Sequence, residues 1–266
     1  MKVIVSGAAG RMGRAILESL YDEDELELGA ALEKKGHPVI KKDVGELIGI
    51  GSWGVSVSTF SKKTMASGAA FIDFTYPQGT IQMLEEAEAQ GKAMVIGTTG
   101  FTADQLGRIE SAAEKIPIVL SPNMSIGVNV LYRLIQEASA ALGSAYDVEI
   151  VEIHHRLKKD APSGTAIRMG EVLAAARGTT LQQSGRFTRQ GNIGVRPVGE
   201  IGIQSLRAGD IVGEHTMTFA GPGERIELTH RAHNRNNFAR GALMAAQWLV
   251  NQKPGLYDMM DVLNLK

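Results

Sequence analysis

The sequence predicts an α/β protein with a doubly wound parallel sheet and a second domain of the α+β class. Three observations lead to this prediction. Short apolar runs alternate with amphipathic segments over the first 120 residues. A glycine-rich loop joins the first apolar run to the first amphipathic segment. From about residue 200, apolar runs follow one another with only turn residues between them. Alternating strands and helices are typical of a parallel sheet. Strands that follow one another without helices between them are typical of an antiparallel sheet.

The first domain is expected to alternate strands with helices. Val3-Ile4-Val5 is an uninterrupted apolar run, which is typical of a buried strand. The segment after it has Ile16, Leu17 and Leu20 at helical spacing and so presents one apolar face. By the same criteria we expect strands at 3–5, 26–32, 70–74, 93–96 and 118–120, and helices at 11–20, 80–90 and 102–115.

The second domain is expected to begin with a helix over 127–143, which carries few charges and should be well buried. A polar, glycine-rich stretch at 178–196 is expected to be a long loop. Three strands without helices then predict an antiparallel meander, because turn residues at 209–210 and 221–223 separate them. The other elements expected are strands at 148–155, 200–207, 211–219 and 225–230, a helix at 166–176, and a final helix at 237–250 that can return to the first domain.

The composition is that of an ordinary globular protein. Of 266 residues, 44% are hydrophobic and the net charge is -1, so a core is possible and no basic field attracts nucleic acid or anionic lipid. The sequence shows neither a membrane-length apolar stretch nor a signal-peptide pattern. It contains no cysteine, which excludes disulfides and thiolate chemistry. We therefore expect a soluble, cytoplasmic protein with no nucleic-acid or membrane partner.

A dinucleotide-binding signature occupies the first strand–helix junction. Gly7, Gly10 and Gly13 form a G-x-x-G-x-x-G pattern between the first strand and the first helix. Glycines let the backbone approach a pyrophosphate, and the helix N-terminus offers N–H donors to phosphate. Glu33 ends the second strand, where a carboxylate can bind a ribose 2′-hydroxyl. The alternative is a glycine-rich turn that binds no ligand.

Cofactor choice depends on the residues beside this acid. Glu33 alone would repel the 2′-phosphate of NADPH, but Lys34 and Lys35 follow it directly and can offset the repulsion. We therefore predict that both NADH and NADPH are used. The alternative is that both lysines are simply solvated.

Two later strand ends complete the expected cofactor site. Gly97-Thr98-Thr99-Gly100 and Phe74-Thr75 follow neighbouring parallel strands, and ligands bind at the carboxyl edge of such a sheet. Glycines and short hydroxyl side chains there can lie against a flat nicotinamide and bond its amide. The alternative for each segment is an ordinary strand–helix loop.

Residues that can carry acid–base chemistry are densest between 152 and 165. Side chains alternate along a strand, so His154 and His155 should face opposite ways, and at most one is the proton donor unless the strand ends there. Imidazole titrates near neutral pH and can give a proton to a reaction intermediate. Lys158 could do the same or bind a carboxylate.

Ser163-Gly164-Thr165 precedes an apolar helix and predicts an anion site made by its backbone N–H groups. Arg156, Lys158 and Lys159 add positive charge, which suits a substrate with carboxylates. The alternative is a solvated basic loop with a capped helix. No metal site is expected, because adjacent histidines on a strand diverge and cysteine is absent. The two further strand histidines, His215 and His230, are expected to be hydrogen-bonded sheet residues.

These motifs resemble the 4-hydroxy-tetrahydrodipicolinate reductase (dihydrodipicolinate reductase) family of the lysine and diaminopimelate pathway. The resemblance extends from Val3 to about Trp248, nearly the whole chain. The motifs that carry it are Gly7 to Gly13 with Arg11-Met12, Gly97-Thr98-Thr99-Gly100, Ser121-Pro122-Asn123-Met124-Ser125 and, most specifically, Glu152 to Thr165.

The resemblance implies a fold and a reaction. A Rossmann-type dinucleotide-binding domain would comprise 1–125 and 236–266. A substrate-binding and oligomerisation domain would be inserted over 126–235, and its open, mainly antiparallel sheet would build a homotetramer. The reaction would be NAD(P)H-dependent reduction of 4-hydroxy-tetrahydrodipicolinate to tetrahydrodipicolinate with loss of water. Hydride would pass from nicotinamide C4 to ring C4 of the substrate.

The roles of individual residues are carried over by position. The resemblance implies His154 as proton donor with Lys158 as its partner. Substrate contacts would come from His155, Lys158, Gly164 and Thr165, and the helix start adds Ser163. Together with the glycine signature and the strand ends, the expected cofactor contacts are Gly7, Gly10, Arg11, Met12, Gly13, Glu33, Lys34, Phe74, Thr75, Gly97, Thr98, Thr99, Ser121, Pro122, Asn123, Met124, Arg235 and Phe238.

One position departs from the family pattern, and two other functions stay open. Some members carry an arginine, which can help hold a 2′-phosphate, where this chain has Tyr76. Its absence gives Glu33 relatively more weight in cofactor choice. The first alternative function is another NAD(P)-dependent dehydrogenase of a small carboxylic acid, and the second is a dinucleotide-binding regulator without catalysis. A regulator would need no acid, so replacing His154 would leave it unaffected.

Overall fold

The computed structural model describes residues 1–266, which divide into two compact units. The first unit comprises residues 1–126 and 235–266, and the second comprises residues 127–234. The chain therefore leaves the first unit once and returns to it near its C-terminus.

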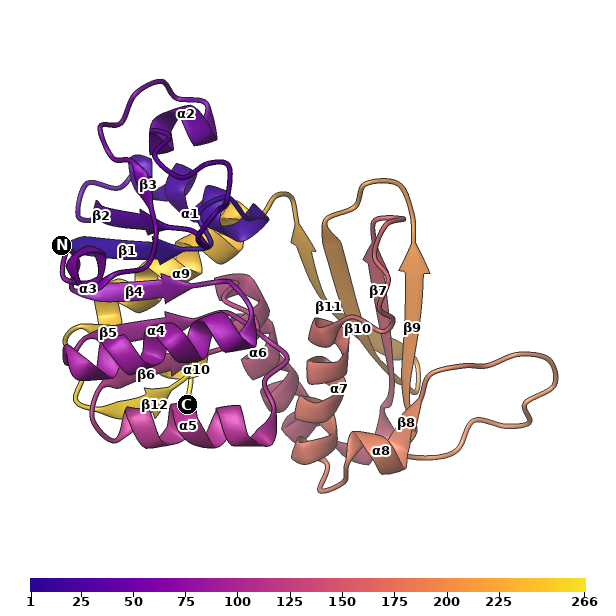
Figure 1. The fold of residues 1–266 in the computed structure, drawn as a ribbon. Coiled ribbons are helices and arrows are strands. Elements are labelled where there is room, and N and C mark those ends of the chain that lie inside the picture. The colour runs from indigo at the N-terminus through magenta and orange to yellow at the C-terminus, as the bar shows by residue number, and fades with distance from the viewer. The chain divides into compact units, whose positions relative to one another are not determined.

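The first unit is built on a seven-stranded parallel sheet (Figure 1) with the strand order β12-β6-β5-β4-β1-β2-β3. Its strands are β1 (Lys2–Ser6), β2 (Glu27–Leu32), β3 (Val57–Ser58), β4 (Ala70–Asp73), β5 (Ala93–Ile96), β6 (Pro117–Leu120) and β12 (Gly255–Tyr257). Its helices are α1 (Arg11–Tyr21), α2 (Val44–Ile48), α3 (Lys62–Met65), α4 (Pro77–Ala89), α5 (Ala103–Ala113), α9 (Asn236–Leu249) and α10 (Met259–Val262).

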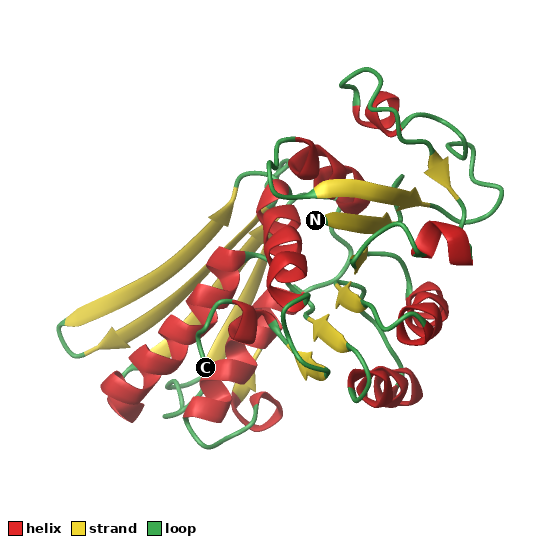
Figure 2. Ribbon diagram, turned by 90° about the vertical axis from the view of Figure 1, so that its left-hand side faces the viewer, coloured by secondary structure: helices red, strands yellow, loops and turns green.

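Helices cover both faces of this sheet (Figure 2). The reason lies in the alternation of side chains along each strand. Val5 of β1 belongs to one apolar cluster with Ile16 of α1 and Leu243 of α9. Its neighbour Ile4 belongs to another cluster, with Leu84 of α4. The predicted doubly wound sheet is confirmed, and the last long helix packs on the first unit.

The second unit contains one five-stranded sheet with the order β11-β10-β7-β9-β8. A single apolar cluster joins it to two long helices, with Ile150 and Phe219 from the sheet, Ile135 from α6 and Leu173 from α7. Its elements are α6 (Ile126–Leu142), a 3-10 turn (Gly143–Ala145), β7 (Asp147–His154), α7 (Gly164–Ala176), α8 (Leu181–Ser184), β8 (Gly185–Arg186), β9 (Ile201–Arg207), β10 (Gly213–Gly221) and β11 (Glu224–Ala232).

The expected meander is wrong in one respect. Only β10 and β11 form the predicted hairpin, because β7 lies between β10 and β9 and runs parallel to β9. The sheet is therefore mixed. In β7, Val148, Ile150 and Glu152 are completely buried. A buried strand needs hydrogen-bonded neighbours on both edges for its backbone N–H and C=O groups. This explains why β7 is the central strand of the sheet.

Several short elements and one helix boundary differ from the expected ones. The stretch 178–196 was expected to be a loop, but it contains α8, whose first turn is capped by the Thr180 hydroxyl accepting from Gln183 N–H, and also β8. Helix α4 begins at Pro77, earlier than expected, because proline is favoured in a first turn. The short elements α2, β3, α3, β12 and α10 were not expected either. None of the helices combines the length and apolar character needed to cross a membrane.

Candidate active site

The loop between β1 and α1 is a tight turn that only glycines allow. Gly7 has a φ of 73°, and its N–H and that of Ala8 donate to Leu32 O at 3.0 and 3.1 Å. A Cβ on Gly13 would lie 2.0 Å from Gly7 O, and one on Gly10 would lie 3.1 Å from the same atom. The backbone of this turn is therefore closely packed against itself, with no room for a side chain at Gly13.

The start of α1 has no side-chain cap. Gly10 occupies the N-cap position, no acidic residue lies in the first turn, and Arg11, Met12 and Gly13 follow. The first N–H groups of a helix lack intrahelical acceptors, and the helix dipole favours an anion at this end. This is an arrangement that can bind a phosphate.

A cavity of about 340 Å³ adjoins the glycine loop. The Glu33 carboxylate lies beside it and accepts from Ala9 N–H at 3.2 Å and from Lys34 N–H at 2.9 Å. Phe60, which the sequence did not single out, and Tyr76 are both partly exposed there. The lining residues are Ser6, Gly7, Leu32, Glu33, Lys34, Lys35, Thr59, Phe60, Thr75, Tyr76, Gly79, Gln82 and Met83.

The ends of β4 and β5 are joined through the buried carboxyl group of Asp73, another residue that the sequence did not single out. Thr98 Oγ1 accepts from Thr75 N–H at 2.9 Å and donates to Asp73 Oδ2 at 2.9 Å. Thr75 Oγ1 donates to Asp73 Oδ1 at 2.8 Å. Burial raises the pKa of Asp73, although the hydroxyl groups around it oppose the change. The ring of Phe74 lies against Gly97, where a Cβ would come within 2.1 Å of it. Thr99 follows in the same loop.

The remaining expected cofactor residues lie elsewhere in the first unit and do not line this cavity. Ser121 follows β6, and its hydroxyl donates to Asn123 O at 2.9 Å across Pro122. Met124 O lies so close to α9 that a Cβ on Gly241 would be 1.8 Å from it. The N-cap of α9 is Arg235, and Phe238 lies in its first turn, outside the cavity.

A second group of polar residues gathers in the second unit, at the end of β7. Glu152 and His154 are two residues apart, so they share one face of the strand. Glu152 Oε2 lies 2.5 Å from His154 Nδ1. Arg207, the last residue of β9, donates from Nη1 and Nη2 to the two oxygens of Glu152, each at 2.9 Å. The strand ends at His154, so His155 lies outside it, half-buried.

This group keeps Glu152 ionised. Although burial raises the pKa of Glu152, hydrogen bonds from Arg207, His154 and Ser205 bring it below its ordinary value. Burial also lowers the pKa of His154, and Glu152 opposes that effect through its hydrogen bond and its charge. His154 is thus an imidazole whose protonated form is stabilised mainly by one carboxylate.

The start of α7 is tied to the same carboxylate. Ser163 N–H donates to Glu152 Oε1 at 3.1 Å, and Ser163 Oγ accepts from Ala166 N–H at 3.2 Å as the helix cap. Gly164 and Thr165 are the first residues of the helix. Ser163 Oγ also lies 2.9 Å from His215 Nε2. The expected proton donor and the expected anion site therefore share Glu152.

His215 belongs to this group, a role that the sequence did not predict. Its ring centroid lies 5.2 Å from that of His154, with the rings nearly perpendicular. Burial lowers the pKa of His215 to about 3, so this imidazole is neutral near pH 7. The His215 ring packs against His154 and is itself fixed by its hydrogen bond to Ser163.

Lys158 lies in the loop after β7 and pairs with an acid. Its Nζ lies 2.8 and 2.9 Å from the Asp160 oxygens. The hydrogen bond from Lys158 lowers the pKa of Asp160. Backbone contacts fix the loop further, because Lys158 N–H donates to His155 O and Arg207 Nη2 donates to Asp160 O.

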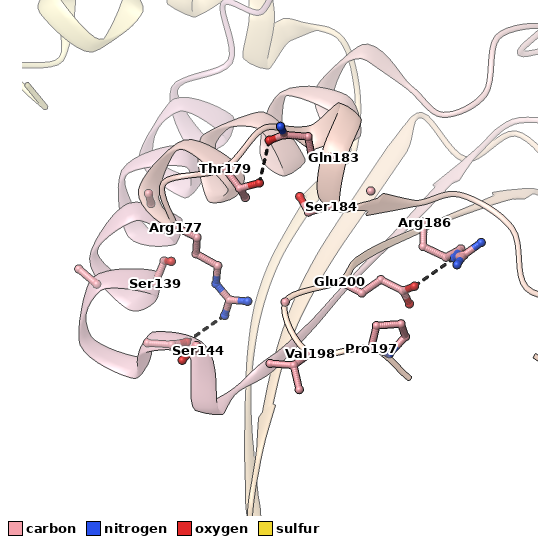
Figure 3. Close-up of a pocket in the computed structure, with 15 residues that line it drawn as sticks. Ser139, Ser144, Arg177, Thr179, Gln183, Ser184, Arg186, Pro197, Val198 and Glu200 are labelled. Carbon is pink, nitrogen blue, oxygen red and sulfur yellow. Dashed lines mark hydrogen bonds and ion pairs between the residues drawn. The ribbon is translucent and has the colours of Figure 1, made fainter. Parts of the chain in front are cut away.

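A larger cavity of about 700 Å³ in the second unit (Figure 3) contains none of the expected site residues. Glu200, just before β9, lies in its wall, whereas Arg207 and His154 pair at the other end of β9. Six residues of strand separate those ends, or about 20 Å. Figure 3 shows that some polar side chains of its wall bond one another, as in the pairs Thr179–Gln183 and Arg186–Glu200. We therefore place the candidate chemistry at the His154 end.

Two family models match the chain. One, described as dihydrodipicolinate reductase, N-terminus, matches residues 1–124. The other, described as dihydrodipicolinate reductase, C-terminus, matches residues 127–263.

Proteins named 4-hydroxy-tetrahydrodipicolinate reductase are similar over their whole length. The one from Syntrophus aciditrophicus is 50% identical over 266 residues, which cover 100% of this chain and 99% of that protein. The one from Anaeromyxobacter dehalogenans (strain 2CP-1) is 51% identical over 265 residues, which cover 100% of this chain and 98% of that protein.

Solved structures agree on the fold. The dipicolinate-bound dihydrodipicolinate reductase from Paenisporosarcina sp. TG-14 matches with a TM-score of 0.78 at 26% identity, over 98% of each chain. An amine dehydrogenase from Mycobacterium smegmatis matches with a TM-score of 0.62 at 13% identity, over 96% of this chain and 94% of that one. The second likeness concerns the fold alone.

Proposed function

This chain belongs to the dihydrodipicolinate reductase family and is an NAD(P)H-dependent oxidoreductase, and on that premise we propose how its two units reduce 4-hydroxy-tetrahydrodipicolinate to tetrahydrodipicolinate. The reaction consumes one NAD(P)H and one proton and releases one water, within lysine and diaminopimelate biosynthesis. One observation carries the proposed site: Glu152 contacts both His154 and the first turn of α7.

We assign cofactor binding to the first unit. The packed glycine loop and the uncapped start of α1 fit a pyrophosphate, since a side chain at Gly13 would fill the turn. Glu33 would bind the ribose 2′-hydroxyl, and the loops around Thr75 and Thr98 would hold the nicotinamide amide. When bound, the reduced nicotinamide supplies a hydride to ring carbon C4 of the substrate.

We assign the substrate and the proton to the second unit. The first turn of α7 would bind a substrate carboxylate through the backbone N–H groups of Gly164 and Thr165 and the helix dipole, while Ser163, whose N–H already donates to Glu152, caps the helix. His155 and Lys158 would contact the same carboxylate. His154 donates its Nδ1–H to Glu152, so the proton that it gives to the substrate leaves from Nε2.

We expect both NADH and NADPH to support turnover, with kcat/KM values within about a thousandfold, or roughly 4 kcal/mol. Glu33 would repel a 2′-phosphate, but two backbone N–H groups already bond its carboxylate and Lys34 and Lys35 line the same cavity. Steady-state kinetics on enzymatically generated substrate measure the ratio, and a larger difference contradicts dual use. Turnover of a different acid, with none of this substrate, would instead favour another dehydrogenase.

We propose a homotetramer formed through the second unit. Helices α6 and α7 cover one face of its sheet, and the face away from that cluster carries Val151, Ile153 and Leu206, of which Leu206 is 49% exposed. Light scattering should therefore give a mass roughly four times the 28.5 kDa of one chain. A mass of one or two chains at micromolar concentration would contradict the tetramer. We also propose a cytoplasmic location, which the absence of cysteine supports.

A further inference from the structure

The imidazole of His154 is held at one nitrogen, and its other nitrogen lies against Gly213. Its Nδ1 lies 2.5 Å from Glu152 Oε2, and Glu152 is completely buried. Arg207 holds the same carboxylate through two hydrogen bonds of 2.9 Å, and Ser163 N–H holds it through a third. A carboxylate fixed from three sides can fix the ring that donates to it.

Gly213, the first residue of β10, leaves space at the other nitrogen. A Cβ on Gly213 would lie 2.9 Å from His154 Nε2 and 3.3 Å from Cδ2. The backbone of Gly213 is not among those with positive φ, so the conformation does not require glycine. The space beside Nε2 is therefore the physical reason for a glycine here. Alanine would force the ring to turn or the strand to move.

We propose that Glu152 and Gly213 are positioning residues for the proton transfer: Glu152 holds Nδ1–H of His154 so that the transferred proton is on Nε2, and Gly213 leaves room for the Nε2 side of the ring in that orientation. This inference rests on the proposed function of His154. The new element is that the orientation of the ring is fixed, so the proton always leaves from Nε2 of His154. After the transfer the ring is a neutral imidazole with its proton on Nδ1, so its bond to Glu152 persists.

The charges around the ring give Glu152 a second effect. The groups that act on His154 are the anionic Glu152, the cationic Lys158 and Arg207, and the neutral ring of His215. Glutamine at position 152 would remove the anion in contact with His154 and leave Arg207 and the Asp160-paired Lys158, which disfavours protonated His154. An acid must be protonated to act, so activity is lost as pH rises through its pKa. Lowering that pKa moves the loss to lower pH.

Glu152→Gln should therefore lower kcat by about tenfold to a hundredfold at pH 8 and shift the alkaline limb of the kcat profile down by about one pH unit. NADH affinity, measured by fluorescence titration, should stay within about twofold, because cofactor binding is assigned to the first unit. Glu149→Gln is the matched control. Glu149 lies on the same strand and pairs with Arg189 at 2.7 Å, away from His154. It should alter neither kcat nor the pH profile.

Gly213→Ala tests the other half without changing any charge. We expect kcat to fall at least about tenfold with little change in NADH affinity, because the new methyl group occupies the space beside Nε2. Gly221→Ala is its control at the opposite end of β10. There a Cβ would meet the Tyr146 ring at 2.6 Å, so crowding is comparable but remote from His154. If both residues act through the orientation of one ring, the double variant should lose less than the product of the two single losses.

These experiments distinguish a failure of the positioning roles of Glu152 and Gly213 from a failure of the proposed function. An unaltered protein that does not reduce the substrate refutes the proposed function. NMR titration of the His154 ring, which needs no turnover, should still show a lower pKa in Glu152→Gln and no change in Glu149→Gln. If the unaltered protein is active, the inference is overturned by a kcat and pH profile in Glu152→Gln that match the unaltered ones. It is overturned equally by a Gly213→Ala variant as active as Gly221→Ala.

Discussion

His154→Gln should lower kcat by roughly two to four orders of magnitude, the usual contribution of a general acid. Glutamine can replace one hydrogen bond to Glu152 but has no group that titrates near neutral pH. KM for the substrate should change little, since the start of α7 is untouched. Stopped-flow measurement of NADH oxidation at several pH values would give the loss directly.

The cofactor provides the internal control for this variant. NADH binding should be nearly unchanged in His154→Gln, because His154 lies in the second unit and the glycine loop in the first. His37→Gln, in a loop of the first unit, should leave kcat within about twofold. Equal losses of NADH binding and of turnover in His154→Gln would show that the proton donor has been misplaced. An unchanged kcat in His154→Gln would instead show that another group donates the proton.

Gly13→Ala should weaken both NADH and NADPH binding by more than about a hundredfold, equivalent to roughly 3 kcal/mol. The new Cβ would lie 2.0 Å from Gly7 O and 2.9 Å from Ala8 Cα, which are backbone atoms that cannot turn aside. The loop must therefore move, and the phosphate-binding turn moves with it. Overpacking of this kind also lowers the free energy of unfolding by about 1 to 3 kcal/mol.

Gly107→Ala is the matched control for that substitution. Gly107 lies inside α5 with nothing within 4 Å of its added Cβ, so alanine should stabilise the protein by about 0.5 to 1 kcal/mol. Isothermal titration with each cofactor and thermal unfolding distinguish the two variants. If Gly13→Ala bound NADH as Gly107→Ala does, the glycine loop would not be the pyrophosphate site.

Much of the first unit could be predicted because its information is local. Glycine spacing, a preceding apolar run and a following amphipathic helix all lie within the first 21 residues. Each crossover helix of a parallel sheet follows its strand directly, so the order of elements nearly determines the architecture. The strand β12 was missed because three residues at an edge carry too little pattern.

The second group of polar residues was only half predictable. The sequence places Glu152 and His154 two residues apart, and alternation along a strand already puts them on one face. That signal could have identified Glu152 as the partner of His154. It could not identify Arg207, which is 55 residues from Glu152 and reaches it only because β7 and β9 are neighbours.

The sequence by itself determined the glycine loop, the alternating elements of the first unit, and the run of residues from His154 to Thr165 that carries the family resemblance. Only the tertiary structure decided that β7 lies between β9 and β10, that His215 packs against His154, and that Gly213 leaves space beside Nε2. The physical reason is that the two-residue period of a strand determines which side chains share a face. The identity of the neighbouring strands depends instead on which buried faces pack together, and that choice is made among residues far apart in the chain.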